Sequence, residues 1–300
     1  MRVELKLERS FSLQDFPSGS SINFRNGKLF LIGDDSNSIL VLDSVYNRLD
    51  SNKLFDSTEK RIPKPIKADL ETSTVITIDG RDHLLILGSA STDNREKIFI
   101  IPFLDSNPDI PHFRIINGDV FTSRLLSSDI REVNIEGSTV IDNRLILGNR
   151  RNEKSDVNHI AITELDFWER QATANLKIAI LQIPAVTNDT PGISELCYVR
   201  ELDMLLLAFS TERTNNAYDD GAIGNSYIGW IENISQKIQS TTLKVDEIKD
   251  LSTIHTEFKN EKIEGLCVES ASGKEIILHL VSDNDMGESK LFKLKLSLHR

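Results

Sequence analysis

The chain has 300 residues, of which 27% are charged and 39% hydrophobic, an ordinary composition for a globular protein. Its formal net charge of -11 at pH 7 argues against nucleic acid and anionic membranes as partners, because both attract basic surfaces. No apolar segment marks a signal peptide at the N-terminus or approaches the roughly 20 residues that span a bilayer. We therefore expect a cytoplasmic protein, and we expect it to be a monomer.

The first predicted element is a strand. Residues from Val3 to Leu13 alternate between apolar and polar side chains, as the two faces of a strand do. The rest of the chain, from Ser18 to Arg300, divides into five similar units, and this strand belongs to none of them. We predict that it pairs with the last unit as its outer strand, because this covers a sheet edge that would otherwise promote aggregation.

Each unit begins with a first strand that opens on a polar residue, followed four positions later by an apolar one. The opening residues are, in chain order, Ser20, Glu71, Glu136, Glu195 and Glu264. A turn such as Asn26-Gly27 comes next, and then a continuously apolar second strand, which is typical of a strand buried on both faces. The second strands cover residues 29–33, 84–88, 145–148, 205–208 and 276–280.

A third strand and a more polar fourth strand complete each unit; residues 242–245 are predicted as the fourth strand of the fourth unit. Helical periodicity is weak, and Glu164 to Ala174 is the best candidate for a short helix. Repeated four-stranded antiparallel units of this length are typical of a β-propeller. We predict an all-β fold, one five-bladed β-propeller domain over residues 1–300 whose N-terminal strand closes the last blade. A sixth blade hidden near residues 106–130 is the alternative.

In a propeller the first strand of each blade lines the central tunnel, so the opening residues of the units are expected to form a ring. Four carboxylates that converge on a narrow tunnel repel one another and need a compensating charge. Ca²⁺ takes six to eight oxygen ligands, which carboxylates, hydroxyls and backbone carbonyls supply, whereas the six scattered histidines argue against zinc. The sequence therefore predicts a calcium site formed by Ser20, Glu71, Glu136, Glu195 and Glu264.

Two other interpretations of the ring are open. The glutamates could accept hydrogen bonds from backbone N–H groups of neighbouring blades and hold no metal. Alternatively, Lys67 could neutralise part of the ring, because it alternates with Asp69 and Glu71 and therefore shares one strand face with them.

The polar loops after the second strands are expected at the tunnel mouth. Three of them contain arginines, Arg150, Arg151 and Arg213 among the candidates, and guanidinium groups bind phosphate or carboxylate with paired hydrogen bonds. Asp34 and Asp35 follow the second strand of the first unit and could position a water molecule. These five residues are the predicted catalytic set, and a small phosphorylated or anionic molecule is the predicted ligand. The longest loop, Ser210 to Ser226, is a candidate lid.

Several of these stretches resemble a known family. The run from Ser20 to Ile39, with Asn26-Gly27-Lys28 and then Asp34-Asp35, resembles the first blade of calcium-activated nucleotidases, the apyrase-type five-bladed propellers. Lys262 to Leu266 resembles their last blade, and its Glu-Gly-Leu motif is also similar to those of phytase-like, or esterase-like, propellers. The resemblance implies one Ca²⁺ in the tunnel, held by first-strand oxygens, and hydrolysis of nucleoside diphosphates. Ser20 departs from the pattern, in which an acidic residue is expected.

Three functions follow from these patterns. The first is a calcium-dependent phosphohydrolase, in which Ca²⁺ polarises a phosphoryl oxygen and the arginines bind phosphate. The second is a non-catalytic binding or scaffolding propeller with a structural metal or none, because propellers host many unrelated functions. The third is a glycosidase that uses two tunnel carboxylates, which the low aromatic content of 6% disfavours. The sequence leaves open whether the protein is an enzyme at all.

Overall fold

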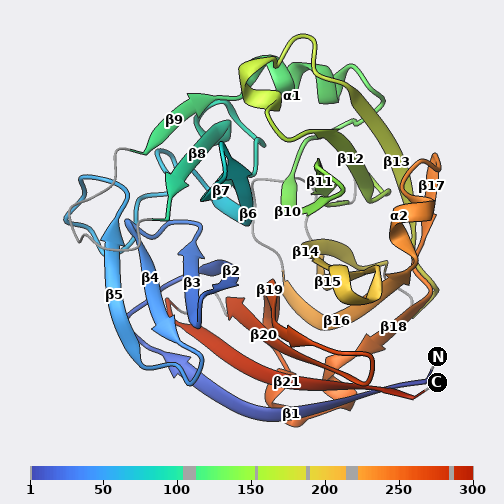
Figure 1. Ribbon diagram of the computed structural model, residues 1–300. Helices are drawn as coiled ribbons and strands as arrows, with labels where there is room; N and C mark the ends of the chain where they lie inside the picture. Colours follow the sequence, from blue (N-terminus) through green and yellow to red (C-terminus); the bar gives the residue numbers. More distant parts are fainter. Residues whose placement is uncertain are drawn as a thin grey trace.

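The computed structural model describes residues 2–103, 113–152, 155–186, 190–213, 222–283 and 287–299, and it has the predicted all-β architecture of five blades around a central tunnel (Figure 1). Blade 1 contains β2 (Gly19–Arg25), β3 (Lys28–Gly33), β4 (Ser38–Asp43) and β5 (Arg48–Lys53). Blade 2 contains β6 (Leu70–Ile78), β7 (Arg81–Gly88), β8 (Lys97–Pro102) and β9 (Arg114–Asn117). Blade 3 contains β10 (Ile135–Ile141), β11 (Arg144–Asn149), β12 (His159–Glu164) and β13 (Leu176–Gln182).

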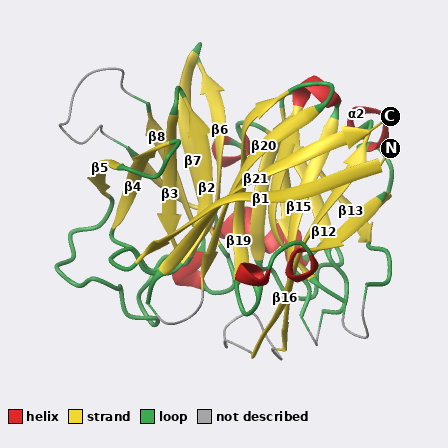
Figure 2. Ribbon diagram, turned by 90° about the horizontal axis from the view of Figure 1, so that it is seen from below, coloured by secondary structure: helices red, strands yellow, loops and turns green. Residues whose placement is uncertain are grey.

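Blade 4 contains β14 (Gly192–Val199), β15 (Met204–Arg213), β16 (Ala222–Glu232) and β18 (Glu247–Asp250). Blade 5 contains β19 (Lys262–Ala271), β20 (Glu275–Asp283) and β21 (Ser289–His299), with β1 (Arg2–Leu13) as its outer strand. The pairing of β1 with β21 is antiparallel and runs from Arg2 opposite His299 to Leu13 opposite Ser289. Figures 1 and 2 show the two strands side by side, with both chain ends together at one edge of the ring. The predicted closure of the last blade is therefore confirmed.

The core of the fold lies between the blades. The second strands are continuously apolar because both of their faces are covered; Leu31, Leu85 and Leu206, for example, are fully buried. Each of the five seams between neighbouring blades contains its own hydrophobic cluster. Burial of these side chains on both sides of every blade is the main stabilising contribution to the ring.

Short elements outside the blades fill the outer parts of three seams. Helix α1 (Asp119–Leu126) and the 3₁₀ turn η2 (Phe167–Glu169) pack between blades 2 and 3. Helix α2 (Ile234–Lys237) and β17 (Thr242–Lys244) cover the seam between blades 3 and 4. The turns η4 (Leu251–Thr253) and η5 (Thr256–Phe258) pack between blades 4 and 5. No helix of the described residues is long and apolar enough to cross a membrane.

Three sequence-based assignments are corrected by these elements. The structure has five blades, and helix α1 occupies part of the region in which a sixth blade was the alternative. Residues Glu164 to Ala174 contain only the one-turn η2 instead of a helix. Strand β17 does not close its own blade; it adds in parallel to β13 of blade 3, and β18 is the fourth strand of blade 4.

Candidate functional site

The innermost strands β2, β6, β10, β14 and β19 all begin at the same end of the tunnel, which we call the acidic end. Each of them contains a β-bulge close to its start, where one residue is skipped in the pairing with the second strand. The skipped residues are Ser20, Glu71, Glu136, Ser194 and Glu264. Four members of the predicted ring thus occupy equivalent positions. In blade 4 the equivalent residue is Ser194, so the alignment of Glu195 with the other glutamates was wrong by one residue.

Glu195 lies one position further along, level with Ser21 and Thr72 and with two glycines, Gly137 and Gly265. Its carboxylate accepts hydrogen bonds from the hydroxyls of Ser21 and Thr72 at 2.9 and 3.0 Å. It also accepts the backbone N–H groups of Ser138 at 3.0 Å and Leu196 at 2.9 Å. The side chain is 1% exposed and ties blades 1 to 4 together. For Glu195, this arrangement agrees with the interpretation that a ring glutamate accepts hydrogen bonds from backbone N–H groups of neighbouring blades.

The side of the acidic end between blades 1 and 2 carries a group that we call the Asp34 cluster: Asp34, Lys67, Asp69, Glu71 and Arg95. Lys67 contacts Asp34 and lies 2.7 Å from Asp69, which also pairs with Arg95 at 2.7 Å. Carboxylate oxygens of Asp34, Asp69 and Glu71 lie within 4.8 Å of one another, a spacing at which one ion can contact all three. No described residue hydrogen-bonds the Glu71 carboxylate.

Burial and like charges perturb the acids of this cluster. Burial raises the pKa of Asp34 to about 7; the ammonium of Lys67 opposes the rise and Asp35 adds to it. The pKa of Glu71 is raised well above its usual value by burial and then by the negative charges of Asp69 and Glu136. Asp34 also has an oxygen, Oδ1, that is buried without a hydrogen-bond partner. A buried carboxylate oxygen without a hydrogen-bond partner is costly.

The other side, formed by blades 3, 4 and 5, carries what we call the Lys262 cluster: Glu136, Arg150, Glu212, Lys262 and Glu264. The Lys262 ammonium lies 2.7 Å from Glu264 and 3.0 Å from Glu212. Glu136 accepts a hydrogen bond from the amide of Asn134 at 2.7 Å. Burial raises the pKa of Glu264 to about 8, although Lys262 opposes this rise. Here each carboxylate has a partner at short range.

The remaining predicted site residues have structural partners. The Ser20 hydroxyl donates to the backbone carbonyl of Leu70 in the next blade. Arg150 is buried and donates to the Ile193 carbonyl at 3.0 Å and to Ser210 Oγ at 2.9 Å. Arg151 donates to the Asp156 and Thr190 carbonyls at 3.1 and 2.8 Å.

Asp35 pairs with Arg61 at 2.6 Å, and its second oxygen is buried without a partner. The Arg213 side chain lies outside the described part of the structure, as do residues 214–221 of the candidate lid.

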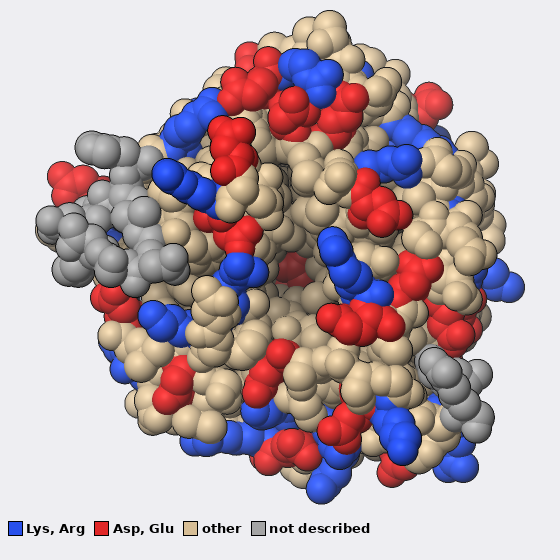
Figure 3. All heavy atoms as spheres, viewed as in Figure 1, with Lys and Arg blue, Asp and Glu red and all other residues tan. Residues whose placement is uncertain are grey.

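The opposite end of the tunnel, where the first and second strands are joined by hairpins, holds a cavity of about 540 Å³ lined by residues of all five blades. Figure 3 shows that this face is hollowed at its centre and that acidic and basic side chains both surround the hollow. Among its lining residues, Arg25 is paired with Asp82, and Glu269 lies 2.6 Å from Lys293. Both free cysteines, Cys197 and Cys267, also line this cavity. Because these two charges are already paired, the acidic end is the stronger candidate.

Sequence reasoning found the acids of the ring and named Lys67 as a cation that could neutralise part of it, but it missed the other partners. Asp69 and Arg95 were not predicted as site residues, and neither was Lys262. A signal for two of them was present, since Lys67, Asp69 and Glu71 alternate along one strand, as do Lys262 and Glu264. Arg95 carried no such signal, because it reaches the cluster from the short turn η1 (Asp93–Arg95).

Comparison with solved structures supports the fold. A glutaminyl cyclase from Myxococcus xanthus matches with a TM-score of 0.56 at 11% identity, over 99% of this chain and 97% of that chain. An exo-1,5-alpha-L-arabinanase from a bovine ruminal metagenomic library matches with a TM-score of 0.53 at 12% identity, over 95% of both chains. The tail fiber of Staphylococcus aureus phage P68 matches with a TM-score of 0.52 at 12% identity, over 99% of this chain and 53% of the fiber chain. At such low identities these likenesses show the architecture alone.

No curated protein sequence matches this chain. A family model does match it, over residues 15–296, from just before the first blade to within a few residues of the end of β21. By this match the chain belongs to the family described as "Family of unknown function (DUF6929)".

Proposed function

We propose that the protein binds a divalent cation, Ca²⁺ in the first place, at the acidic end of its tunnel, and that the cation in turn binds a small anionic ligand. Asp34, Asp69 and Glu71 would supply the first oxygen ligands, because their carboxylates already lie within 4.8 Å of one another. Glu136 and Glu264 are the nearest further acids of the ring, since their charges raise the pKa of Glu71. Ser20 and Glu195 of the originally predicted set would instead hold blades together through the hydrogen bonds described above.

The observation that carries this proposal is an excess of buried negative charge. In the described part of the acidic end, carboxylates outnumber the cations that face them: Asp34, Asp35, Asp69, Glu71, Glu136, Glu212 and Glu264 against Arg61, Lys67, Arg95, Arg150 and Lys262. Burial, and after it the neighbouring negative charges, raise the pKa values of Asp34 and Glu264 to about 7 and about 8, so protons can compensate part of the excess near neutral pH. A bound cation would replace these protons at neutral pH.

The donors fit calcium in type and in position. All of them are oxygens, and the Oδ1 atom of Asp34 is buried and lacks a partner, as an unfilled coordination site would. Lys67 competes for the same space, because its ammonium already contacts Asp34 and Asp69. We therefore infer that a cation binds on the Glu71 side of the cluster, where no described residue forms a hydrogen bond or an ion pair with the carboxylate, although its charge acts on Lys67.

When bound, such a cation polarises an anionic oxygen of its ligand. A phosphate ester is the ligand class to test first, and hydrolysis would require a further group that orients water. A non-catalytic binding propeller is the second candidate. This candidate is favoured because Arg150 and Arg151 donate hydrogen bonds to backbone carbonyls and to a neighbouring side chain of the protein itself. These guanidinium groups are therefore less available to bind a phosphate during catalysis.

The experiment has two parts. Calcium titrated into protein that has been stripped with a chelator is followed by calorimetry and by thermal melting, with magnesium as the comparison. Saturable calcium binding together with a higher Tm supports the site, and the absence of both refutes it. Phosphate release from ADP and from phytate, with and without chelator, then separates the candidates: calcium-dependent release supports a phosphohydrolase, and calcium binding without release supports a binding propeller.

A further inference from the structure

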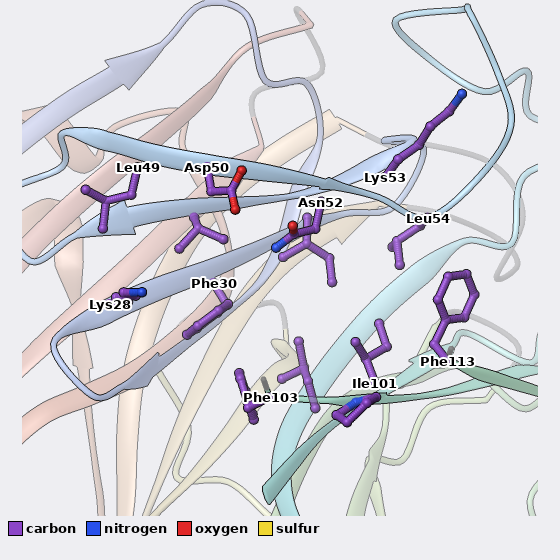
Figure 4. A pocket seen from close by; sticks show the side chains of 14 residues that line it. Lys28, Phe30, Leu49, Asp50, Asn52, Lys53, Leu54, Ile101, Phe103 and Phe113 are labelled. Carbon is purple, nitrogen blue, oxygen red and sulfur yellow. The ribbon is translucent and has the colours of Figure 1, made fainter. Parts of the chain in front are cut away.

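A cleft lies on the outside of the ring, in the seam between blades 1 and 2, away from both ends of the tunnel. Its volume is about 250 Å³, and its walls come from β3, β4 and β5 of blade 1 and from β7 and β8 of blade 2. Most lining residues are apolar, with Phe30, Phe103 and Phe113 as the aromatic ones. Figure 4 shows these rings with Ile101 along one wall, and Asp50 and Asn52 of β5 along the other.

The cleft exists because this seam is filled differently from the others. The seams between blades 2 and 3, 3 and 4, and 4 and 5 each receive a short helix, a 3₁₀ turn or an extra strand that inserts apolar side chains from outside the blades. The seam between blades 1 and 2 contains no such element among the described residues, and its hydrophobic cluster consists mainly of strand residues and Leu54. Protein interiors are normally close-packed, so an apolar space of this size is unusual and is large enough to admit a small molecule.

The polar groups of the cleft gather at one end. Figure 4 places Lys28 and Asp50 towards the end at Leu49, and Phe113 at the opposite end. No described residue forms an ion pair with Lys28 or with Asp50, and Asp50 accepts only the backbone N–H of Ser51 at 2.8 Å. The side chain of Lys53 points away from the cleft and pairs with Asp56 at 2.7 Å. One cation and one anion therefore border the mouth of an aromatic space.

We propose that this cleft binds a small zwitterion with an aromatic body, of the class of a free aromatic amino acid. Its ring would pack against Phe30 and Phe103, which already meet edge to face with centroids 4.9 Å apart. Its carboxylate would pair with Lys28 and its ammonium with Asp50, and the Asn52 amide, further along the same wall than Asp50, could accept or donate a hydrogen bond. A largely apolar pocket with a few polar groups at one end is the usual form of a small-molecule site.

The volume of the cleft is large enough for a ligand of this class. A dry apolar cavity of about 150 Å³ is enough to bind benzene, so about 250 Å³ accommodates a benzene ring with a three-carbon head group. The proposal does not depend on the cation site, because no lining residue of the cleft belongs to the Asp34 cluster or to the Lys262 cluster.

The test uses L-phenylalanine as the probe and the full-length protein, with calorimetry or equilibrium dialysis as the readout. Two matched compounds each lack one charge: 3-phenylpropionate has no ammonium, and phenethylamine has no carboxylate. We expect L-phenylalanine to bind in a 1:1 ratio and each matched compound to bind about tenfold more weakly, since a charged hydrogen bond is lost. Equal binding of all three compounds, or no binding of L-phenylalanine, would overturn the proposal.

Two substitutions assign the charges. Lys28→Gln should weaken L-phenylalanine and 3-phenylpropionate about tenfold and leave phenethylamine unchanged. Asp50→Asn should weaken L-phenylalanine and phenethylamine by a similar factor and leave 3-phenylpropionate unchanged. Both side chains are exposed, so neither variant is expected to disturb the fold. If the affinities do not change in this crossed pattern, Lys28 and Asp50 do not bind the carboxylate and the ammonium of the ligand.

A filling substitution tests the empty space itself. Val41 is buried on β4 and lines the cleft, so Val41→Phe should abolish L-phenylalanine binding while keeping or raising the Tm. Ile162→Phe is the matched control, since Ile162 faces the seam that α2 and β17 fill, and there the added volume should lower the Tm by several degrees. A Tm that falls equally in both variants would mean that the protein itself fills the cleft and that the proposal is wrong.

Discussion

The two sides of the acidic end contain similar residues in different balance. In the Lys262 cluster, one ammonium lies within about 3 Å of two carboxylates and Arg150 stands 3.6 Å from one of them. In the Asp34 cluster, Lys67 and Arg95 form ion pairs with Asp34 and Asp69, and no described residue forms an ion pair or a hydrogen bond with Glu71, whose charge acts on Lys67 from a greater distance. A ring of acids is therefore not by itself a metal site. We therefore place the proposed cation on the side where one carboxylate has no ion pair with a described residue.

The sharpest test of this difference replaces each lysine. Lys262→Met should cost about 3–5 kcal/mol of stability, because it leaves Glu264 buried without its ion pair and removes the nearer cation from Glu212. Lys67→Met should cost a similar amount in the presence of a chelator, but added calcium should restore most of it and bind more tightly than to the unchanged protein. Denaturant unfolding with and without calcium measures both effects. Calcium that rescues both variants equally, or neither, would break the comparison.

Substitutions should also show which glutamates of the ring bind the cation and which only stabilise the fold. Glu71→Gln should weaken calcium binding roughly ten- to hundredfold, because it removes a charged ligand of the Asp34 side. Glu195→Gln is the matched variant: it should lower the Tm through its lost hydrogen bonds and leave the calcium affinity unchanged. Calorimetric titration of both proteins decides the assignment: weaker calcium binding in both variants would return the site to the sequence-based ring, and an effect of Glu195→Gln alone would contradict our assignment.

The pH dependence of stability follows from the raised pKa values. A carboxyl group whose pKa is higher in the folded than in the unfolded chain stabilises fully below the unfolded pKa, and this contribution is lost as the pH rises through the folded value. For Asp34 this value is about 7, and for Glu264 about 8. Raising the pH from 6 to 8 without calcium should therefore cost about 1 kcal/mol for Asp34.

Calcium should remove this pH dependence, because it takes the place of the protons, and its stabilising effect should be larger at pH 8 than at pH 6. Asp34→Asn is the control, since the amide does not titrate there. Melting curves at the two pH values, with chelator and with calcium, give the four Tm values to compare. A Tm that is independent of pH in chelator would show that these carboxyl groups do not carry the excess charge.

The smallest effect is expected for Arg151. Its guanidinium donates to two carbonyls at the surface, so Arg151→Gln should change stability by less than about 0.5 kcal/mol and leave calcium binding unchanged. If the same variant weakens binding of a phosphate ester about tenfold, Arg151 contacts the ligand, as the sequence predicted for it.

The fold was predictable because its signals are repeated. Five apolar second strands with turns before them define the blades, and the alternation of Val3 to Leu13 was enough to place β1 on β21. The shift in blade 4 had a signal that the alignment by glutamates missed: the skipped residue directly follows Leu70, Ile135 or Ile263 in three other blades, and in blade 4 Ser194 directly follows Ile193. The parallel pairing of β17 with β13 had no local signal, because a neighbouring blade supplies the partner strand.

For the candidate site, the sequence identified the acids and the calcium-compatible donor type but not the charge balance. That balance depends on which lysine reaches which carboxylate. Lys67 and Lys262 both stand just before a ring glutamate in sequence, yet Lys262 lies 2.7 Å from its ring glutamate whereas Lys67 contacts Asp34 and Asp69. Only the three-dimensional arrangement distinguishes these two outcomes.

The pairing of β1 with β21 also sets the order in which the ring can form. Val3 and Leu5 belong to the same hydrophobic cluster as Leu296 and Leu298, nearly three hundred positions later. During synthesis these first apolar residues have no partner until the last strand has left the ribosome, although the earlier blades can assemble one after another in the meantime. Joining residues so distant in sequence is intrinsically slow, so we expect closure of blade 5 to be the last and rate-limiting event of folding.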